Sequence, residues 1–312
     1  GIFNKFGTPA ELICALTEAS MMRELARQAG RPGMPMAEVP CSGISPFAII
    51  ASYNANGYNP KTSLPAIQLF PGLKINWERL ILMAWAQEFG IQPWSGYWQV
   101  TGTYERDALE AAIATTGGDL ALLSMSHGTL KYGCAISVAA MQPPGKLADS
   151  LRPSIWQDYH TDSLKVLAMG RNVNLLNAYL RGGGGGACTK EVVYGNMIAG
   201  FYGSAVGFAV LSGGLATPGG AAPGVPMNAS TGMEGKAYCE GGLAGAGIDR
   251  QETNKIMKRL MEFWDPLTKD RPVGKTFPEC YDVEKVEPTD EYKQVYAEAR
   301  QDLREQGFPF KY

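Results

Sequence analysis

A histidine that follows an apolar run is the first residue in this sequence that could do chemistry. His127 is one of two histidines, and it follows residues 119–124, which have the length and composition of a buried strand. Imidazole titrates near neutral pH, and in an α/β barrel the carboxyl ends of the strands carry the active site. The sequence therefore predicts that His127 is an acid or base facing a pocket, or else a hydrogen-bonded core residue.

Two carboxylates are further candidates. Glu88 ends a helical pattern over residues 77–89, in which its sequence neighbours are apolar. Burial there would raise its pKa and make it a usable acid, whereas the alternative interpretation is a solvated helix end. Glu105 falls in the first turn of a predicted helix, where stabilisation of the helix dipole explains it as well as catalysis does.

Three aromatic residues, Trp94, Tyr97 and Trp98, cluster just before the helix that is predicted from Thr103. Such a cluster could line a pocket for a flat substrate, although aromatic side chains fill protein cores more often than they bind ligands. We expect these three residues, together with Glu105, to bind the substrate.

Five consecutive glycines at residues 182–186 suggest a phosphate loop, because bare N–H groups at a helix start attract anions. The next residues are Ala187 to Lys190 (ACTK), so the Gly-Lys-Ser/Thr ending of a nucleotide-binding loop is missing. We expect a flexible or close-packed segment that lines a pocket instead. No zinc-like spacing of Cys and His occurs, and a metal such as zinc would need ligands from separate strands.

Alternating strands and helices must position these residues. Buried strands are predicted at 48–51, 66–70, 98–101 and 119–124, and helices at 76–89 and 103–115. This alternation favours a parallel sheet covered by helices. The fold class is therefore α/β, and the chain length suits a TIM-type (β/α)8 barrel. We expect one domain over residues 1–312.

A helical extension is expected from about residue 249 to residue 312. Asp249 and Glu252 form a capping pair ahead of an apolar helix face. A last helix is predicted from Thr289, with tyrosines among its inward residues and Gly307 closing it.

The composition excludes several classes of protein. Of the 312 residues, 45% are hydrophobic and 19% are charged, with a formal net charge of -2. That charge offers no general attraction to nucleic acid or to an anionic membrane, and the apolar runs are far shorter than the roughly 20 residues of a membrane span. Six cysteines without a CxxC pair fit a reducing cytoplasm.

Several stretches carry a resemblance to a known family. Residues 274–283 (GKTFPECYDV), 288–296 (PTDEYKQVY) and 230–234 (STGME) resemble archaeal monomethylamine:corrinoid methyltransferases. Residues 29–34 (AGRPGM) resemble the segment just ahead of the pyrrolysine of that family. The resemblance implies a TIM-type barrel, a cytoplasmic enzyme, and methyl transfer to the Co(I) corrinoid of a partner protein.

The resemblance also implies a longer protein. It places about 150 further residues before Gly1, in line with a helix start at Thr8, directly after the first residues. We also expect a homo-oligomer.

The sequence departs from the family where the amine-activating residue should stand. Ungapped counting places Ala37 opposite pyrrolysine, one family carboxylate falls near Ala66, and a family glutamine falls in the 182–186 run. The other carboxylate matches Glu88 only with a gap, whereas His127 falls opposite a family histidine. The chain is thus expected to keep the scaffold and to lose the methylamine chemistry.

This departure directs the expected substrate. Relatives without pyrrolysine include enzymes that demethylate methoxylated aromatics, whose ether oxygen must be polarised or protonated as Co(I) attacks the methyl carbon. We expect O-demethylation, with His127 and Glu88 near the ether oxygen and Tyr97 and Trp98 against the ring. A methylated amine or betaine is the alternative donor, because aromatic cages suit quaternary ammonium groups. A non-catalytic homologue that binds a corrinoid protein is a further alternative.

Overall fold

The structure is a computed structural model that describes part of the chain in full and part by its backbone. Most residues are described with side chains at 107–124, 163–168, 186–208, 232–264 and 272–311, as are single residues within 23–32, 77–88 and 266–267. The backbone alone is described at 36–38, 63–69, 94–99, 133–137, 177–183 and 210–216. The chain forms two compact units, residues 1–98 with 115–134 and residues 99–114 with 135–312.

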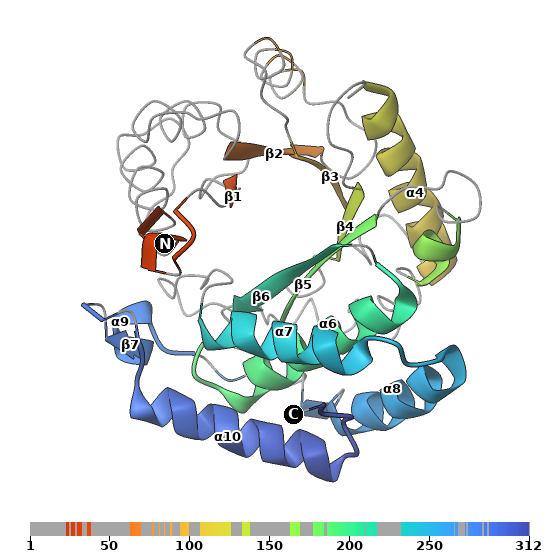
Figure 1. The fold of residues 1–312 in the computed structure, drawn as a ribbon. Coiled ribbons are helices and arrows are strands. Elements are labelled where there is room, and N and C mark those ends of the chain that lie inside the picture. Colours follow the sequence, from red (N-terminus) through yellow and green to blue (C-terminus); the bar gives the residue numbers. More distant parts are fainter. Residues whose placement is uncertain are drawn as a thin grey trace. The chain divides into compact units, whose positions relative to one another are not determined.

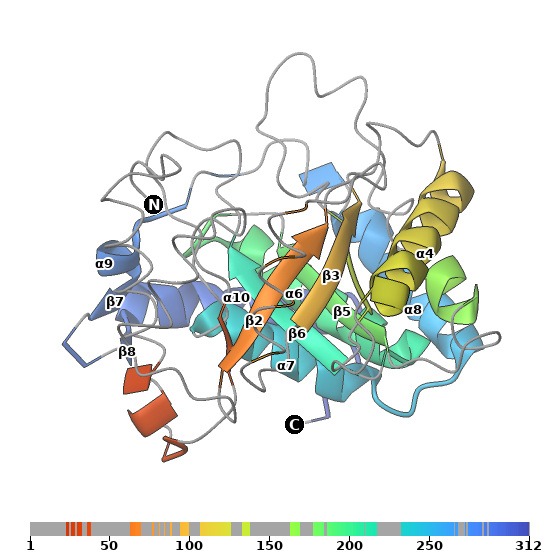
Figure 2. The same ribbon diagram turned by 90° about the horizontal axis from the view of Figure 1, so that it is seen from above.

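The first unit contains three parallel strands: β1 (Met36–Glu38), β2 (Ser63–Leu69) and β3 (Trp94–Gln99). Strand β2 pairs with β1 on one side and with β3 on the other, and Figure 2 shows β2 and β3 running side by side in the same direction. The strand predicted at 66–70 is confirmed as β2. The strand predicted at 98–101 begins four residues earlier, at Trp94.

Helix α4 (Ala108–Met125) is longer than predicted. It begins after Asp107, whose Oδ1 accepts the N–H groups of Leu109 and Glu110 at 2.9 Å each. The helix continues through Gly117 and Gly118, because the alanine and leucine residues on both sides favour helix strongly enough to carry two glycines. The strand predicted at 119–124 is therefore wrong, since those residues are the second half of α4.

The second unit contains a strand–helix–strand segment that the sequence analysis did not predict, because its strands contain several glycines. Strand β5 (Asn177–Gly183) leads into α6 (Lys190–Val206), which leads back to β6 (Val210–Ala216), and the two strands pair in parallel. The register shifts between Arg181 and Gly183, where the glycine run begins. Strand β4 (Gly133–Ser137) precedes this segment in the chain.

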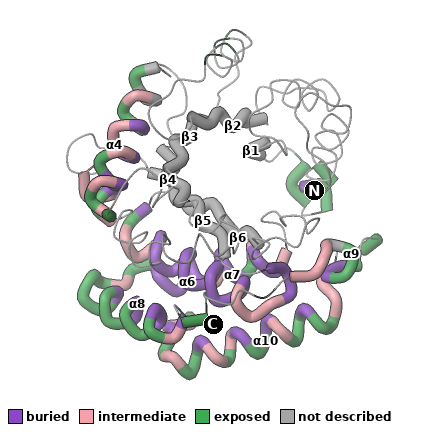
Figure 3. The backbone as a smooth tube through the Cα atoms, turned by 180° about the vertical axis from the view of Figure 1, so that it is seen from behind, coloured by how far each residue is buried: buried purple, intermediate pink, exposed green. Residues whose placement is uncertain are grey.

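Helices form two layers over the second unit's strands. Helices α6 and α7 (Met233–Gly245) pack against β5 and β6, and the outer helices α8 (Arg250–Trp264) and α10 (Asp290–Glu305) pack on α6 (Figure 1). Figure 3 shows the consequence, with α6 and α7 mostly buried and α8 and α10 exposed on their outer sides. Helix α6 is buried along residues 192–203, which is typical of a helix enclosed on several sides.

Helices α6 and α7 approach each other closely enough for backbone contact. A Cβ atom at Gly241 would come within 2.1 Å of the Met197 carbonyl oxygen. A Cβ atom at Gly200 would come within 2.1 Å of the Tyr238 carbonyl oxygen. At Gly245 the corresponding distance is 2.2 Å, to the oxygen of Phe201. Only glycine fits at these crossings, which resemble the small-residue contacts that let helix backbones meet.

The two helices predicted near the C-terminus begin at the predicted caps. Asp249 caps α8 by accepting the N–H groups of Gln251 and Glu252 at 2.8 and 3.0 Å. Thr289 caps α10, and Gly307 follows it with φ +78°. Between these helices lie α9 (Phe277–Cys280) and the antiparallel strands β7 (Tyr281–Asp282) and β8 (Glu287–Pro288). None of the helices in the described part of the chain is long and apolar enough to cross a bilayer.

Candidate functional site

The first unit's strands bring three sequence positions of interest onto neighbouring strands. Ala37 lies in the middle of β1, level with Leu64 of β2. Two residues further along β2, Ala66 pairs directly with Trp94 of β3. The position opposite pyrrolysine, the position near a family carboxylate, and the first predicted aromatic residue thus share one small region. Two of the three positions carry only a methyl side chain.

The aromatic residues that the sequence singled out lie within β3 itself. Trp94 begins the strand, Tyr97 pairs with Leu69 of β2, and Trp98 follows Tyr97. They were expected in a segment just ahead of a helix. All three lie in a strand of a parallel sheet, where only Trp98 was predicted to be in a strand, and the carboxyl ends of such strands build ligand sites.

Glu88 is helical, as predicted, and exposed. Three other described residues at helical spacing, Trp77, Ile81 and Ala84, are exposed as well, so all four share one solvent-facing side of this segment. The burial that would have made Glu88 a usable acid is absent. Exposure agrees with the alternative interpretation, a solvated helix end.

His127 and Glu105 lie outside the described residues, so their predicted roles stay predictions. The strand end that led to the choice of His127 is nevertheless absent, because residues 119–124 are helical. His127 follows the end of α4 at Met125, not the end of a strand.

The end of the glycine run is packed against the C-terminal segment. The Gly186 N–H donates to the Pro272 oxygen at 3.4 Å, and the Lys275 N–H donates to the Ala187 oxygen at 3.0 Å. A Cβ atom at Gly274 would come within 2.2 Å of the Ala187 nitrogen. For Gly186, the close-packed interpretation is therefore confirmed, and its N–H is already used by the protein.

At the start of the helix that follows the glycine run, the Thr189 and Lys190 side chains contact other protein groups. Thr189 caps α6 by accepting the Val192 N–H at 3.3 Å. The Lys190 Nζ reaches away from the loop, to Asp302 at 3.0 Å and Glu298 at 3.2 Å on α10. These contacts agree with the sequence-based rejection of a nucleotide-binding loop.

A buried carboxylate, Glu234, joins the two motif stretches 230–234 and 274–283. It lies in the first turn of α7 and is only 1% exposed. The Tyr281 hydroxyl donates to one carboxylate oxygen at 3.0 Å, and the Tyr292 hydroxyl donates to the other. We call Glu234, Tyr281 and Tyr292 the Glu234 cluster.

Tyr281 also caps α7 from outside the helix. The N-cap residue Gly232 has no side chain, and the Tyr281 hydroxyl accepts the Met233 N–H at 2.8 Å in its place. A Cβ atom at Gly232 would lie 1.7 Å from that hydroxyl oxygen, so glycine leaves room for the capping phenol. The motif STGME and the tyrosine of CYDV therefore belong to one structural arrangement.

The phenols of the Glu234 cluster stay protonated. Burial raises the pKa of Tyr281 and of Tyr292, and the nearby Glu234 carboxylate raises both further. For Tyr292, a hydrogen bond from the Cys188 backbone acts in the opposite direction. Both hydroxyls are thus permanent donors to Glu234 at neutral pH.

Two buried thiols, Cys188 and Cys280, lie beside the cluster. Burial raises the pKa of the Cys188 thiol and raises the pKa of Cys280 to about 12. Neither is therefore an activated thiolate nucleophile at neutral pH. Within the described residues, no group of three or more His, Cys, Asp and Glu side chains could hold a metal ion.

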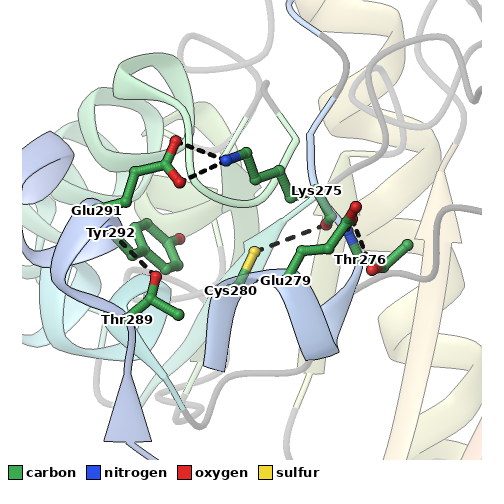
Figure 4. Close-up of polar contacts among 7 residues, drawn as sticks. All are labelled: Lys275, Thr276, Glu279, Cys280, Thr289, Glu291 and Tyr292. Carbon is green, nitrogen blue, oxygen red and sulfur yellow. Dashed lines mark hydrogen bonds and ion pairs between the residues drawn. The ribbon is translucent and has the colours of Figure 1, made fainter. Parts of the chain in front are cut away.

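Ordinary structural contacts involve four residues of the GKTFPECYDV motif, Lys275, Thr276, Glu279 and Cys280 (Figure 4). The Lys275 Nζ contacts both Glu291 carboxylate oxygens at 2.5 Å, and the Cys280 Sγ lies 3.7 Å from the Lys275 oxygen. Glu279 accepts from the Thr276 N–H at 2.8 Å, which caps α9. The sequence analysis used these motifs only for the resemblance and missed Glu234, although an acidic residue in the first turn of a helix that begins after Gly232 was a usable signal.

Comparisons with known proteins agree on one family. The chain matches the sequence profile of monomethylamine methyltransferase MtmB over residues 1–308. It is 26% identical to monomethylamine methyltransferase MtmB1 of Methanosarcina acetivorans over 309 residues, which cover 97% of this chain and 62% of the relative. It is also 26% identical to MtmB of Methanosarcina mazei over 310 residues, which cover 97% and 63%.

Solved structures show the same fold. The crystal structure of the Methanosarcina barkeri monomethylamine methyltransferase superimposes with a TM-score of 0.81 at 23% identity, covering 98% of this chain and 63% of that chain. The crystal structure of a hydroxylamine complex of MtmB gives a TM-score of 0.80. The chain thus has the fold of these proteins and spans 62 to 63% of the length of the relatives described above.

Proposed function

The chain belongs to the monomethylamine methyltransferase MtmB family, and we propose that it transfers a methyl group from a methylated amine to the Co(I) corrinoid of a partner protein. The family match over residues 1–308 carries this proposal. It supports the methylated-amine alternative of the sequence analysis better than the methoxylated aromatic, because the matching relatives are named for methylamine.

We also propose that the fold class of the chain is a TIM-type barrel. The parallel pairing of β1 with β2 and β3, and of β5 with β6, supports it, because all-parallel sheets covered by helices are typical of that fold. The likeness to the solved structures over 98% of the chain supports it as well.

The donor we propose is a quaternary amine of the betaine type. An amine leaves a methyl carbon readily only when its nitrogen is positively charged and departs as a neutral amine. Where the family has its amine-activating residue, this chain has Ala37, so a donor that is already quaternary suits it better than monomethylamine. In the transfer, the methyl carbon forms a bond to cobalt with the Co(I) electron pair, and the C–N electron pair stays with the departing amine.

Strand β3 offers the residues to bind such a donor. Because successive residues of a strand alternate between its two faces, Trp94 and Trp98 share one face of β3 and Tyr97 lies on the other. We propose that the two tryptophans supply aromatic faces for the quaternary ammonium group, which attracts the negative face of an aromatic ring. The small residue Ala66, which pairs with Trp94, would leave room for the donor's methyl groups. His127, Glu88 and Glu105 have no step in this transfer, because a quaternary amine needs no proton in order to leave.

A cobalt absorbance assay tests the proposal. The protein is mixed with a corrinoid protein reduced to Co(I), and methylation is followed with monomethylamine, trimethylamine, glycine betaine and a methoxylated benzoate in parallel. Fastest methylation from glycine betaine is expected. Fastest methylation from the methoxylated benzoate would overturn the donor assignment. Binding of the corrinoid protein without methylation from any donor would favour the non-catalytic alternative.

A further inference from the structure

Helices α6 and α7 run in the same direction, so their first turns lie at the same end of the pair. Two backbone contacts, each four residues further along both helices, show this order: Met197 with Gly241, and Phe201 with Gly245. Counting back by the same number of residues along both helices places Lys190, at the start of α6, level with Glu234, in the first turn of α7.

Both helix starts belong to the edge of the sheet at which ligand sites form. Helix α6 follows β5, helix α7 follows β6, and the two strands are parallel. A helix that follows a strand in such a unit begins beside the carboxyl end of that strand, where α/β proteins bind their ligands. The placement of these two helix starts therefore bears on the geometry of a site at this edge.

One later segment, residues 274–281, contacts both helix starts, and we call it the C-terminal brace. Just before α6, the Ala187 oxygen accepts the Lys275 N–H at 3.0 Å. The two backbones touch here, because a Cβ atom at Gly274 would lie 2.2 Å from the Ala187 nitrogen. The brace thus holds the start of α6 by backbone contacts.

At the start of α7, the C-terminal brace contributes a side chain. The Tyr281 hydroxyl accepts the Met233 N–H at 2.8 Å and donates to the Glu234 carboxylate at 3.0 Å. The N-cap residue Gly232 has no side chain that could do the same. The first turn of α7 therefore takes its cap from a residue 48 positions away in the chain.

Hydrogen bonds within the C-terminal brace connect its two ends. The Cys280 N–H donates to the Thr276 oxygen at 3.1 Å, and the Cys280 Sγ lies 3.7 Å from the Lys275 oxygen (Figure 4). The Glu279 carboxylate accepts the Thr276 N–H at 2.8 Å. These short-range bonds make α9 one compact turn, so a displacement at Tyr281 is passed on to the contact before α6.

We propose that Tyr281 is a positioning residue, which holds the C-terminal brace on the start of α7 and so fixes the starts of α6 and α7 together for methyl transfer. The inference rests on the proposed function where it speaks of methyl transfer. The coupling of the two helix starts is a separate physical property, which is measured without a donor. Positioning of this kind matters for rate, because a misplacement of about 1 Å can cost about a hundredfold.

Amide hydrogen exchange tests the coupling in both directions. In Tyr281→Phe, exchange of the Lys275 amide should speed up about tenfold relative to the amides of α8, as the loss of a buried hydrogen bond implies. Gly274→Ala pushes the brace away from Ala187 and should speed exchange of the Met233 amide by a similar factor. Acceleration confined to the helix start beside each substitution, or spread equally over α8, would overturn the proposal.

Tyr202→Phe is the matched control. It also removes a tyrosine hydroxyl from this helix pair, but Tyr202 lies about 18 Å from Lys190 along α6 at 1.5 Å per residue, and its hydroxyl bonds Ser163. Exchange of the Lys275 amide relative to α8 should stay within about twofold of the unmodified protein. An acceleration as large as that in Tyr281→Phe would overturn the specific role of Tyr281.

An exchange of capping residues separates positioning from local capping. The atoms of Tyr281 nearest to a Cβ atom at Gly232 are OH, Cζ and Cε1, which leucine lacks, so Tyr281→Leu makes room for a serine cap. Adding Gly232→Ser to Tyr281→Leu should slow exchange in the first turn of α7 about fivefold and leave the Lys275 amide as fast as before. Equal slowing at both places would show that Tyr281 is a cap alone and would overturn the proposal.

The cobalt assay tests the functional half. Tyr281→Phe is expected to lower kcat about tenfold and to keep the donor KM within about twofold, as for a residue that orients the site without touching the donor. Tyr202→Phe should change neither constant by more than about twofold. Unchanged kcat in Tyr281→Phe would overturn this half. Failure of the unmodified protein to methylate cobalt from any donor would overturn the proposed function instead, and exchange of the Lys275 amide would still decide the coupling.

Discussion

At the scale of single residues, the motifs that carry the family resemblance make structural contacts. The positions at which the sequence departs from the family are different residues. Gly232, Glu234 and Tyr281 belong to one buried arrangement that caps α7 and contacts α10 through Tyr292. Ala37 and Ala66 lie on neighbouring strands, at positions that the resemblance places opposite the pyrrolysine of the family and near one of its carboxylates. A shared scaffold with altered reactive positions would suit the change of donor that we propose.

The capping arrangement at α7 gives a stability prediction. Gly232→Ala should lower the free energy of unfolding by about 3 kcal/mol, because the new Cβ atom would overlap the Tyr281 hydroxyl and displace a rigid buried ring. Tyr281→Phe should cost less, about 1 to 2 kcal/mol, since it loses hydrogen bonds but keeps the packing. Denaturant unfolding measures both values. A smaller cost for Gly232→Ala than for Tyr281→Phe would contradict this account.

At the scale of elements, the sequence predicted those helices that have capping residues and an amphipathic pattern. Helices α8 and α10 begin at the predicted residues, because Asp249 and Thr289 are capping residues ahead of one-sided apolar faces. Helix α4 was misjudged, because it is apolar on several sides and two glycines at 117–118 imitate a loop.

Strands β5 and β6 were missed for a related reason. Their sequences, NAYLRGG and VLSGGLA, contain glycines that lower strand propensity, and their parallel pairing comes from partners distant in sequence. For the candidate site, too, the sequence indicated residues that are close together in the chain and not contacts between distant segments. The aromatic residues lie together in β3, and their role in binding stays a prediction, whereas the premise for His127 failed together with the strand at 119–124. The Glu234 cluster depends on contacts across about 50 residues of chain, which single-sequence patterns do not contain.

The crossing of α6 and α7 gives a prediction for a pair of elements. Gly241→Ala should destabilise the protein by about 3 kcal/mol, because the Cβ atom would meet the Met197 backbone oxygen and the helices would have to move apart. Gly117→Ala in α4 is the matched control, since nothing lies within 4 Å of its Cβ position and alanine favours helix by about 1 kcal/mol. Thermal melts of both variants report the difference. Equal melting temperatures would mean that the helices tolerate a wider crossing.

At the scale of the whole molecule, the C-terminal residues return to cover the second unit's inner helix. Helix α10 contacts α6 through Tyr194 and Lys190, which both bond Asp302. Burial keeps Tyr194 protonated by raising its pKa, and the hydrogen bond from Tyr194, followed by that from Lys190, lowers the pKa of Asp302 below 3.8. One carboxylate thus connects segments 108 to 112 residues apart in the chain.

This carboxylate makes the outer helix layer sensitive to acid. Because the pKa of Asp302 is lower in the folded protein, its stabilising contribution is complete above the unfolded value of 3.8 and is lost as the pH falls through the lowered pKa. Asp302→Asn should therefore reduce stability at pH 7 by about 1 kcal/mol, a modest value for a partly exposed carboxylate, and the difference from the unmodified protein should close below pH 3.8. Glu305→Gln, which changes an exposed carboxylate bonded to Gln301 within α10, is the control variant in the same helix. Thermal melts at pH 7 and at pH 3 measure the stability of both variants. If Asp302→Asn were as much less stable than the unmodified protein at pH 3 as at pH 7, the contact would not depend on the charge of Asp302.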